Sequence, residues 1–359
     1  MRLIQTVGDL SIGSSSINLS QVTQKLDFLH LKYESLGLND HSKLLIVEKG
    51  GRILGPFNSS HTGSLLWMNQ WWDETSNLFS DWNIGGERLW IAPELQYNVT
   101  DRSDIQNSYS LPREMDPSHY SLKVGIDSSI HLDTEMKLET FIDPKESHNL
   151  TIKRRIKPIG NPLKDLIETH SYMKDLSYSG YSHTIELESD ALYKKMSEPW
   201  IIMQVRQGGI SIVPTYSKAQ IGWYYRPTTK ETIVANDRLL IAVHDKENLF
   251  KIGLHSTSFT GRVGYLYTKE EPYLIIRNYF VSPHNNYVEE PFSAPKERGY
   301  AFHLYNSGVR GAQFGEVESQ GASIGGPSGQ RKSTTHIETY IFEGKREQLE
   351  RVAQLLLSY

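Results

Sequence analysis

Short runs in which apolar and polar residues alternate fill most of this chain, and no other feature limits its fold as strongly. Examples are HLDTEMKLETF, RLLIAVHD and YLIIRNYFV, and a period of two residues is typical of a β-strand with one buried face. Glycine pairs at Gly50-Gly51 and Gly208-Gly209 separate neighbouring runs, as tight hairpin turns require. The pattern predicts an all-β chain, and the lack of a fixed-period repeat disfavours a propeller or a solenoid.

Two segments instead repeat apolar side chains at helical spacing. Residues 20–35 begin with a capping serine, Ser20, and residues 345–358 place leucines and a valine on one face. We expect both helices to cover a sheet. Residues 157–195 break the alternation, so we interpret them as an irregular insertion between two strands, with room for a short helix. No stretch resembles a domain linker, and residues 1–359 are therefore predicted to form a single domain.

Composition excludes several classes of function. The formal net charge is −4 and the lysines and arginines are dispersed, so the chain lacks the basic surface that nucleic acids bind. The absence of cysteine rules out disulfides, thiolate metal ligands and a cysteine nucleophile. No apolar run approaches the thickness of a bilayer, and the N-terminal residues do not resemble a signal peptide. We expect a soluble, cytoplasmic protein without a nucleic-acid or membrane partner, as a monomer or a weak homodimer.

The segment GGERLWIAPE, residues 85–94, concentrates groups that suit a sugar ligand. In a strand that leaves the Gly-Gly turn, Arg88 and Trp90 point to one face, and Glu87 points to the other, apolar face. A tryptophan ring can take the C–H face of a pyranose, while a guanidinium and a carboxylate such as that of Glu94 bind its hydroxyl groups. The alternative interpretation is a core tryptophan beside a surface ion pair.

Several blocks in a fixed order resemble a known superfamily. KLLIVEKGGRILGPF, GGERLWIAPE, EPWIIMQVRQGGISIVP, FGEVESQG and THIETYIFEG are similar to an uncharacterised bacterial family of galactose mutarotase-like proteins. The resemblance extends from about Leu26 to the final helix. It implies a supersandwich of two large antiparallel sheets, packed face to face, with a concave cleft and peripheral helices. It also implies a carbohydrate ligand, because the superfamily contains aldose 1-epimerases, sugar-phosphate epimerases and pure binding modules.

The resemblance implies a catalytic base on a late strand. Mutarotation needs a base that takes the proton of the anomeric hydroxyl group and an acid that protonates the ring oxygen, and the superfamily uses a glutamate and a histidine. FGEVESQG places Glu316 and Glu318 on one strand face, where mutual repulsion would raise the pKa of one of them. We assign Glu316 first and Glu318 second as the base. The alternative is that both carboxylates lie on a solvated strand face.

The acid is harder to assign from the sequence. ETHSYM, around His170, is similar to the epimerase motif in which Asn-His precedes Ser/Thr-Tyr-Phe, but Thr169 and Met173 replace the Asn and the Phe. His170 is the candidate acid on this basis. Other histidines compete with it, and each of them could instead be a buried structural residue: His183, His244, His303 and His336.

Further residues are candidates for substrate contact: Arg88, Trp90, Glu94, Trp200, Gln204, Lys251 and His336. Lys251 lies between Phe250 and Ile252, so it would point to the wet side of a strand, and an exposed strand lysine is the alternative. No cofactor or metal site is predicted, since His336 and Glu338 alone are too few ligands; a structural divalent cation is an open alternative. The leading hypothesis is a carbohydrate-binding protein with epimerase chemistry, and the alternative is a non-catalytic carbohydrate-binding or interaction module.

Overall fold

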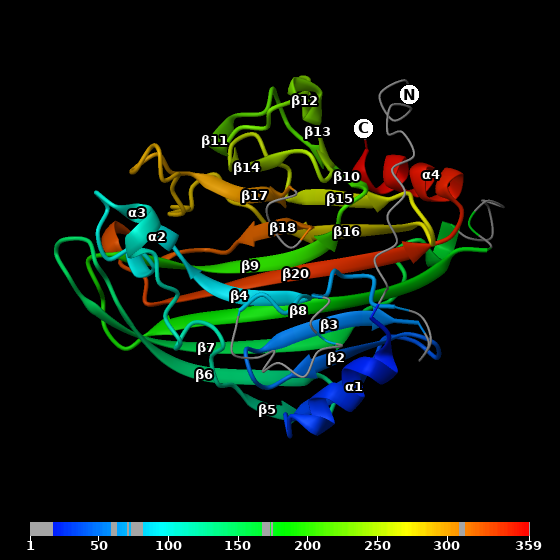
Figure 1. Ribbon diagram of the computed structural model, residues 1–359, viewed down its shortest axis with the longest axis horizontal. Helices are drawn as coiled ribbons and strands as arrows, with labels where there is room; N and C mark the ends of the chain where they lie inside the picture. Colours follow the sequence, from blue (N-terminus) through cyan, green and yellow to red (C-terminus); the bar gives the residue numbers. More distant parts are fainter. Residues whose placement is uncertain are drawn as a thin grey trace.

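The computed structural model describes residues 17–58, 63–69, 72, 82–166, 173, 175–308 and 313–358, and it consists mainly of two antiparallel sheets (Figure 1). In spatial order, the first sheet contains β1 (Tyr33–Gly37), β2 (Lys43–Val47), β3 (Arg52–Phe57), β4 (Glu87–Ala92), β9 (Met196–Arg206), β18 (Phe314–Gln320), β17 (Tyr300–Ser307), β14 (Leu249–His255) and β11 (Ile221–Tyr225), with β19 (Ile324–Gly325) paired to β9.

The second sheet is similar in size. In spatial order, it contains β12 (Ile233–Ala235), β13 (Leu239–His244), β10 (Gly209–Pro214), β15 (Arg262–Tyr267), β16 (Tyr273–Tyr279), β20 (Lys332–Glu343), β8 (Ser177–Ser189), β7 (Ser147–Pro158), β6 (Ile130–Glu139) and β5 (Ser121–Val124). The largest buried apolar cluster combines Ile201 and Val317 of the first sheet with Ile337 and Ile341 of the second. The two sheets therefore pack face to face, and the predicted all-β sandwich is confirmed.

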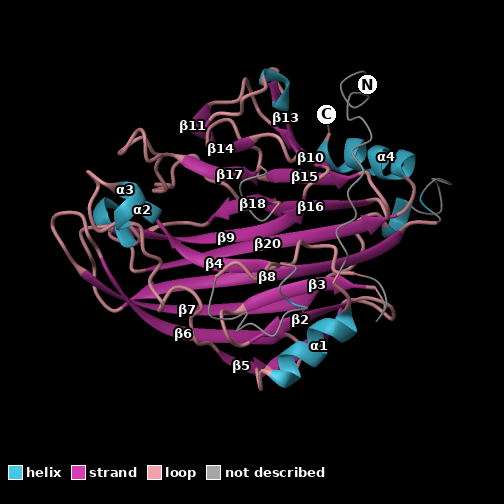
Figure 2. Cartoon of the chain, in the orientation of Figure 1, coloured by secondary structure: helices cyan, strands magenta, loops and turns pink. Residues whose placement is uncertain are grey.

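The helices are short and lie outside the two sheets (Figure 2). The α-helices are α1 (Leu19–Phe28), α2 (Glu94–Tyr97), α3 (Ile105–Ser108) and α4 (Arg346–Leu357), and the 3-10 helices are η4 (Lys164–Leu166), η6 (Lys230–Thr232) and η7 (Gly326–Ser328). Among the described residues, no helix has the length and apolar character needed to cross a bilayer.

The two longer helices cover the outer faces of the sheets, which explains the continuous apolar run of β2. Leu44 and Ile46 belong to the core between the sheets, whereas Leu45 and Val47 pack with Val22 of α1 in a separate cluster. Helix α4 covers the second sheet in the same way. A strand that is buried on both faces loses its alternation of polar and apolar residues.

The N-terminal helix is shorter than the predicted residues 20–35. It ends at Phe28, because His30 adopts a positive φ of 53°, and residues 33–37 pair with β2 as a strand. The N-cap is Asn18 rather than Ser20: the Asn18 side chain accepts the backbone N–H of Gln21, and the Gln21 side chain accepts that of Asn18. This reciprocal capping box fixes the start of the helix.

The insertion predicted at residues 157–195 is also too long. Strand β7 continues to Pro158 and β8 occupies Ser177–Ser189, so the break between these strands is limited to residues 159–176. Strand β8 pairs with β20 along its length and with β7 on its other side. Both neighbours of β8 form backbone hydrogen bonds with it, so β8 is a regular strand although it lies within residues 157–195, where the sequence was interpreted as irregular.

Candidate functional site

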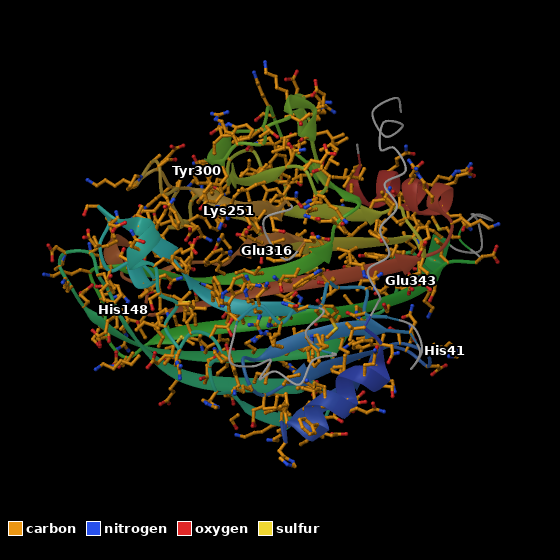
Figure 3. The ribbon with its side chains drawn as sticks, viewed as in Figure 1. His41, His148, Lys251, Tyr300, Glu316 and Glu343 are labelled. Carbon is orange, nitrogen blue, oxygen red and sulfur yellow. The ribbon has the colours of Figure 1, made fainter. Side chains whose placement is uncertain are left out.

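The candidate site is built on the outer face of the first sheet, from strands that are distant in sequence. Opposite residues of antiparallel neighbours share a face. Gln204 on β9 lies opposite Glu316 on β18, Glu316 lies opposite Tyr305 on β17, and Tyr305 lies opposite Lys251 on β14. Strand pairing therefore brings four polar side chains to one face, and Figure 3 shows Lys251 and Glu316 in this region.

This face carries a cavity of about 700 Å³, which we call the central hollow. Six of the residues predicted to contact substrate or act as the base line it: Arg88, Trp90, Glu94, Trp200, Lys251 and Glu316. The other lining residues are mostly aromatic or polar: Trp82, Ile105, Gln106, Tyr109, Tyr224, Tyr225, Phe292, Ser293 and Tyr305. A cavity of this size with aromatic walls and a few polar groups has the properties of a small-molecule site.

A buried ion pair forms part of the floor. Arg88 Nη2 donates to Glu316 Oε1 at 2.8 Å, and the two side chains are only 2% and 8% exposed. Gln204 Nε2 donates to the same carboxylate oxygen at 3.3 Å. The Arg88 guanidinium lies 4.5 Å from the ring centre of Trp90 and 4.9 Å from that of Trp82. Because the cation is held by a carboxylate and two rings, its position is fixed before any ligand binds.

The Gly85-Gly86 turn positions Arg88 at the start of β4. Both glycines have positive φ angles, 103° and 75°. A Cβ atom at Gly85 would lie 2.5 Å from the carbonyl oxygen of Trp67, and one at Gly86 would lie 2.4 Å from that of Ile53. Only glycine fits so close to these backbone atoms, which explains why this sequence begins the strand with a glycine pair.

Trp90 is held by a carboxylate that sequence reasoning missed. Its Nε1 donates to Asp116 Oδ2 at 2.8 Å, and Arg52 Nη2 donates to the same oxygen at 2.5 Å. Burial raises the pKa of Asp116, and the charge of Arg52 opposes that rise. Asp116 lies in an irregular segment, where no periodicity could indicate its direction. Trp90 is thus buried, as the alternative interpretation expected, but the neighbouring ion pairs are buried too.

Lys251 is a second cation that is already paired. Its Nζ lies 3.6 Å from Glu318 Oε2 and 3.9 Å from Glu94 Oε2, and it lies 4.5 Å from the ring centre of Trp200 and 5.3 Å from that of Tyr224. Burial alone would lower the pKa of Lys251, but the surrounding carboxylates outweigh burial and raise it. The ammonium group therefore stays charged at neutral pH.

Glu318 lies behind the lining of the central hollow rather than in it. The residue is fully buried, and its Oε2 accepts a hydrogen bond from Trp200 Nε1 at 2.8 Å. Its other carboxylate oxygen has no hydrogen-bond partner among the described residues. Burial raises the pKa of Glu318 to about 7, Lys251 opposes the rise, and repulsion from Glu316 adds to it. The repulsion expected from the sequence is thus present, but burial is the larger cause.

Two further buried glutamates support the edge of the hollow. The backbone N–H of Glu94, at the start of α2, donates to Glu289 Oε2 at 2.7 Å. Glu198 in turn accepts the N–H groups of Val288 and Glu289, at 2.9 and 3.2 Å. Burial raises the pKa of Glu289, and it raises that of Glu198 to about 8. Sequence reasoning missed both glutamates. Residues 281–299 contain no helix or strand, and β9 is buried along most of its length, so no alternation indicates the direction of Glu198.

The predicted histidines are not brought to the central hollow. His170 lies outside the described residues. His336 is exposed on β20 of the second sheet, where its Nδ1 contacts Thr184 Oγ1 at 2.8 Å and it lines a separate cavity of about 900 Å³. The structure therefore does not place His336 beside Glu316.

The other three competing histidines, His183, His244 and His303, are buried. His303 is the nearest of them, since its Nε2 lies 2.9 Å from the hydroxyl of Tyr224, a lining residue. Burial lowers the pKa of His303. His183 contacts Glu87 between the sheets at 2.7 Å, and burial lowers the pKa of His244 to about 3. Within the described residues, no histidine lines the central hollow.

Metal binding finds no support in the described part of the chain. There, no group of three or more His, Asp or Glu side chains is arranged to hold a metal ion. The chemistry available in the hollow is therefore that of paired carboxylates and cations, tyrosine hydroxyl groups and aromatic faces.

Comparison with known proteins supports the fold. A family model described as "Family of unknown function (DUF6786)" matches residues 20–359. A candidate aldose 1-epimerase from Escherichia coli K12 has a TM-score of 0.51 and 11% identity, over 87% of this chain and 99% of that chain. A galactose mutarotase-like protein from Lactobacillus casei ATCC 334 has a TM-score of 0.51 and 10% identity, over 86% and 100%. A candidate mutarotase from Salmonella typhimurium has a TM-score of 0.50 and 12% identity, over 88% of this chain and 91% of that chain.

No curated protein matches the sequence. The predicted resemblance to the galactose mutarotase-like superfamily is confirmed for the fold. At these identities, the similarity of structure carries no residue roles from one protein to the other.

Proposed function

The chain belongs to the family of unknown function DUF6786, and we propose that its central hollow binds a carbohydrate. The observation that carries this proposal is the combination of exposed rings with fixed charged groups in one cavity. Tyr225 and Tyr109 are 41% and 38% exposed, so their rings are free to stack on a sugar. The paired groups of Arg88, Glu316 and Lys251 line the same cavity and would bind hydroxyl groups.

The charge of the hollow favours a neutral sugar over a sugar phosphate. Arg88 is neutralised by Glu316, and Lys251 lies between Glu318 and Glu94. A phosphate group would have to displace a carboxylate from a buried cation, which is costly because the carboxylate would lose its partner. Hydroxyl groups can instead donate to a carboxylate and accept from a cation without breaking the pair.

A second candidate function is the interconversion of sugar anomers, as the names of the similar structures suggest. The specific observation is that Glu316 and Glu318, on one strand face, have different surroundings, with Glu316 paired to Arg88 and the pKa of Glu318 raised by burial to about 7. Glu316 would take the proton of the anomeric hydroxyl group, and the bond between the anomeric carbon and the ring oxygen would then break. Lys251, which lines the hollow and lies 3.6 Å from Glu318, would protonate the ring oxygen and leave the open-chain aldehyde. Rotation of the aldehyde group, attack of the former ring hydroxyl on its other face, and return of one proton to Lys251 and of the other from Glu316 would give the other anomer.

Binding remains the leading proposal, because the acid is poorly matched to catalysis. The carboxylates around Lys251 raise its pKa, and an efficient general acid has a pKa near the working pH. The lining tyrosines share this disadvantage, since burial raises the pKa values of Tyr225 and Tyr305. Proton transfer from any of these groups to a ring oxygen would be slow.

Nuclear magnetic resonance separates the two functions. Saturation transfer from the protein to a panel of free aldoses and sugar phosphates measures binding, and exchange spectroscopy measures anomer interconversion. We expect binding of neutral sugars that weakens in Tyr225→Ala and persists in the control Glu188→Gln, an exposed glutamate of β8. Interconversion lost in Glu316→Gln would establish the second function. If the wild-type protein and a fold-checked control give no signal with any sugar, monosaccharide binding is refuted.

A further inference from the structure

A second cavity of about 710 Å³ lies beside the central hollow, and we call it the second hollow. It is formed by the irregular segment 111–119, the turn after β2 and one edge of β6. Its polar lining residues include Lys49, Arg113, Asp116, Ser118, His119 and Glu135. This cavity could not be predicted from the sequence, since the segment 111–119 has no periodic pattern.

The two hollows share a wall. Trp82 lines both of them, and its ring lies 5.7 Å from that of Trp90, edge to face. Asp116, in the wall of the second hollow, accepts the Nε1–H of Trp90, in the wall of the central hollow. A partly buried tryptophan that lines two cavities offers one aromatic surface against which consecutive sugar rings can pack.

Two polar atoms behind the lining of the second hollow have no hydrogen-bond partner among the described residues. Asp116 and Ser118 are 4% and 3% exposed, and both line the cavity. Asp116 Oδ1 and Ser118 Oγ have no hydrogen-bond partner among the described residues. A buried polar group without a partner is costly, and a ligand hydroxyl group would remove that cost only after the side chains that cover these two atoms move.

The charged lining of the second hollow is balanced, as in the central hollow. Its cations are Lys49, Arg113 and Lys137, and its carboxylates are Glu114, Asp116 and Glu135. Such a lining offers donors and acceptors in similar number without attracting a strongly charged group. A neutral polyhydroxylated ligand fits this chemistry.

We propose that the two hollows form one extended cleft, and that the ligand is a neutral oligosaccharide that spans Trp82. Each cavity is large enough for a small molecule, so a monosaccharide fills only one of them. An oligosaccharide of two or more residues places one ring in the central hollow and the next in the second hollow. This inference rests on the proposed carbohydrate function and extends it to the length of the ligand.

The test compares ligand length in the intact protein. Calorimetric titration with gluco-, galacto- and xylo-oligosaccharides of one to four residues gives a Kd for each length. Glu135 is exposed on β6 and lines the second hollow but not the central hollow. The variant Glu135→Trp therefore places a large side chain in the second hollow alone. Arg113→Trp fills it from the opposite segment, should the first variant fail to fold. Glu188→Trp, which lines neither hollow, is the matched control.

We expect at least one series in which two or three residues bind about tenfold more tightly than one. In Glu135→Trp or Arg113→Trp this gain disappears while the monosaccharide Kd is unchanged, and in Glu188→Trp the gain persists. Equal affinity at all lengths, or a gain that survives both blocking variants, overturns the extended cleft and leaves the carbohydrate function standing. Failure of every sugar to bind refutes the carbohydrate function itself, and the extended cleft with it.

Discussion

The Arg88–Glu316 ion pair gives the sharpest test of how the floor of the cleft is held together. Arg88→Met keeps an apolar stem between the rings of Trp82 and Trp90 but removes the cation. Glu316 then has only Gln204, at 3.3 Å, to bond the oxygen that faced Arg88. Removing one partner of a buried pair costs about 3–5 kcal/mol, because an uncompensated charge stays behind. We expect the free energy of unfolding to fall by this amount.

A double-mutant cycle shows whether the stranded charge is the cause. Glu316→Gln combined with Arg88→Met removes both charges, so the double variant should be more stable than Arg88→Met alone, by about 2 kcal/mol. Urea unfolding followed by circular dichroism at pH 7 measures each variant. Lys332→Met is the control, because its ion pair with Glu186, at 2.7 Å, has side chains that are 52% and 39% exposed.

The control should cost less than about 1 kcal/mol, since exposed ion pairs contribute little. The reasoning is refuted if Arg88→Met costs no more than Lys332→Met. It is equally refuted if the double variant is destabilised by the sum of the two single changes, because the stranded charge would then have no effect.

Three further perturbations test the charges and rings around the cleft. Burial raises the pKa of Glu198 from 4.5 to about 8, so its contribution to stability is full below pH 4.5 and is lost as the pH rises through 8. Glu198→Gln should therefore reduce the decline of the unfolding free energy between pH 5 and 9 by roughly 4 kcal/mol. Urea-unfolding profiles against pH that run parallel for the wild type and the variant would contradict this. The charge of Lys251 opposes the rise that burial causes in the pKa of Glu318. Lys251→Met should therefore move this pKa above about 7 in a carbon-detected NMR titration. An unchanged pKa would show that Lys251 does not influence the ionisation of Glu318. Tyr225→Ala, at a 41% exposed ring, should change the unfolding free energy by less than about 1 kcal/mol and weaken sugar binding about tenfold; unchanged affinity in the same NMR assay would remove the ring from the site.

Strand alternation predicted an all-β chain, and the resemblance to the galactose mutarotase-like superfamily implied its two-sheet sandwich. The period of two residues places Arg88 and Trp90 on one face of β4 and Glu316 and Glu318 on one face of β18, and strand pairing then brings these faces together. The end of the first helix was missed, since the positive φ of His30 leaves no mark in a pattern of apolar residues. The pattern also describes only segments that alternate, so it is silent about irregular ones.

The rest of the site depends on contacts that no local pattern records. Asp116 and Glu289 come from irregular segments, and they reach the cleft only because the sheet positions Trp90 and Glu94 beside them. The second hollow depends on the irregular segment 111–119, which carries Asp116. Long-range partners of this kind follow from the tertiary fold, in which a polar group takes whichever complementary group packing brings within reach.

Glu87 shows most clearly what lies beyond alternation. It was expected on the apolar face of β4, and it faces the core as a fully buried carboxylate. Arg277 Nη1 of β16 lies 3.1 Å from its Oε2, and His183 Nδ1 of β8 lies 2.7 Å from its Oε1. Burial alone would raise the pKa of Glu87, but these neighbours outweigh burial and lower it to about 2.

Two adjacent residues thus make buried ion pairs on opposite faces of one strand: Arg88 with Glu316 in the cleft, and Glu87 with Arg277 in the core. A slip of β4 by one residue would exchange the two faces. A slip in one direction would move Arg88 to the position of Glu87, where it would meet Arg277 between the sheets. A slip in the other direction would move Glu87 to the position of Arg88, where it would meet Glu316 in the cleft. Either slip would break both ion pairs and bring two like charges together. The like-charge contacts would make a slipped strand less stable than the loss of apolar packing alone would make it. The ion pairs therefore fix the register of the strand that carries the binding residues, whatever they contribute to stability.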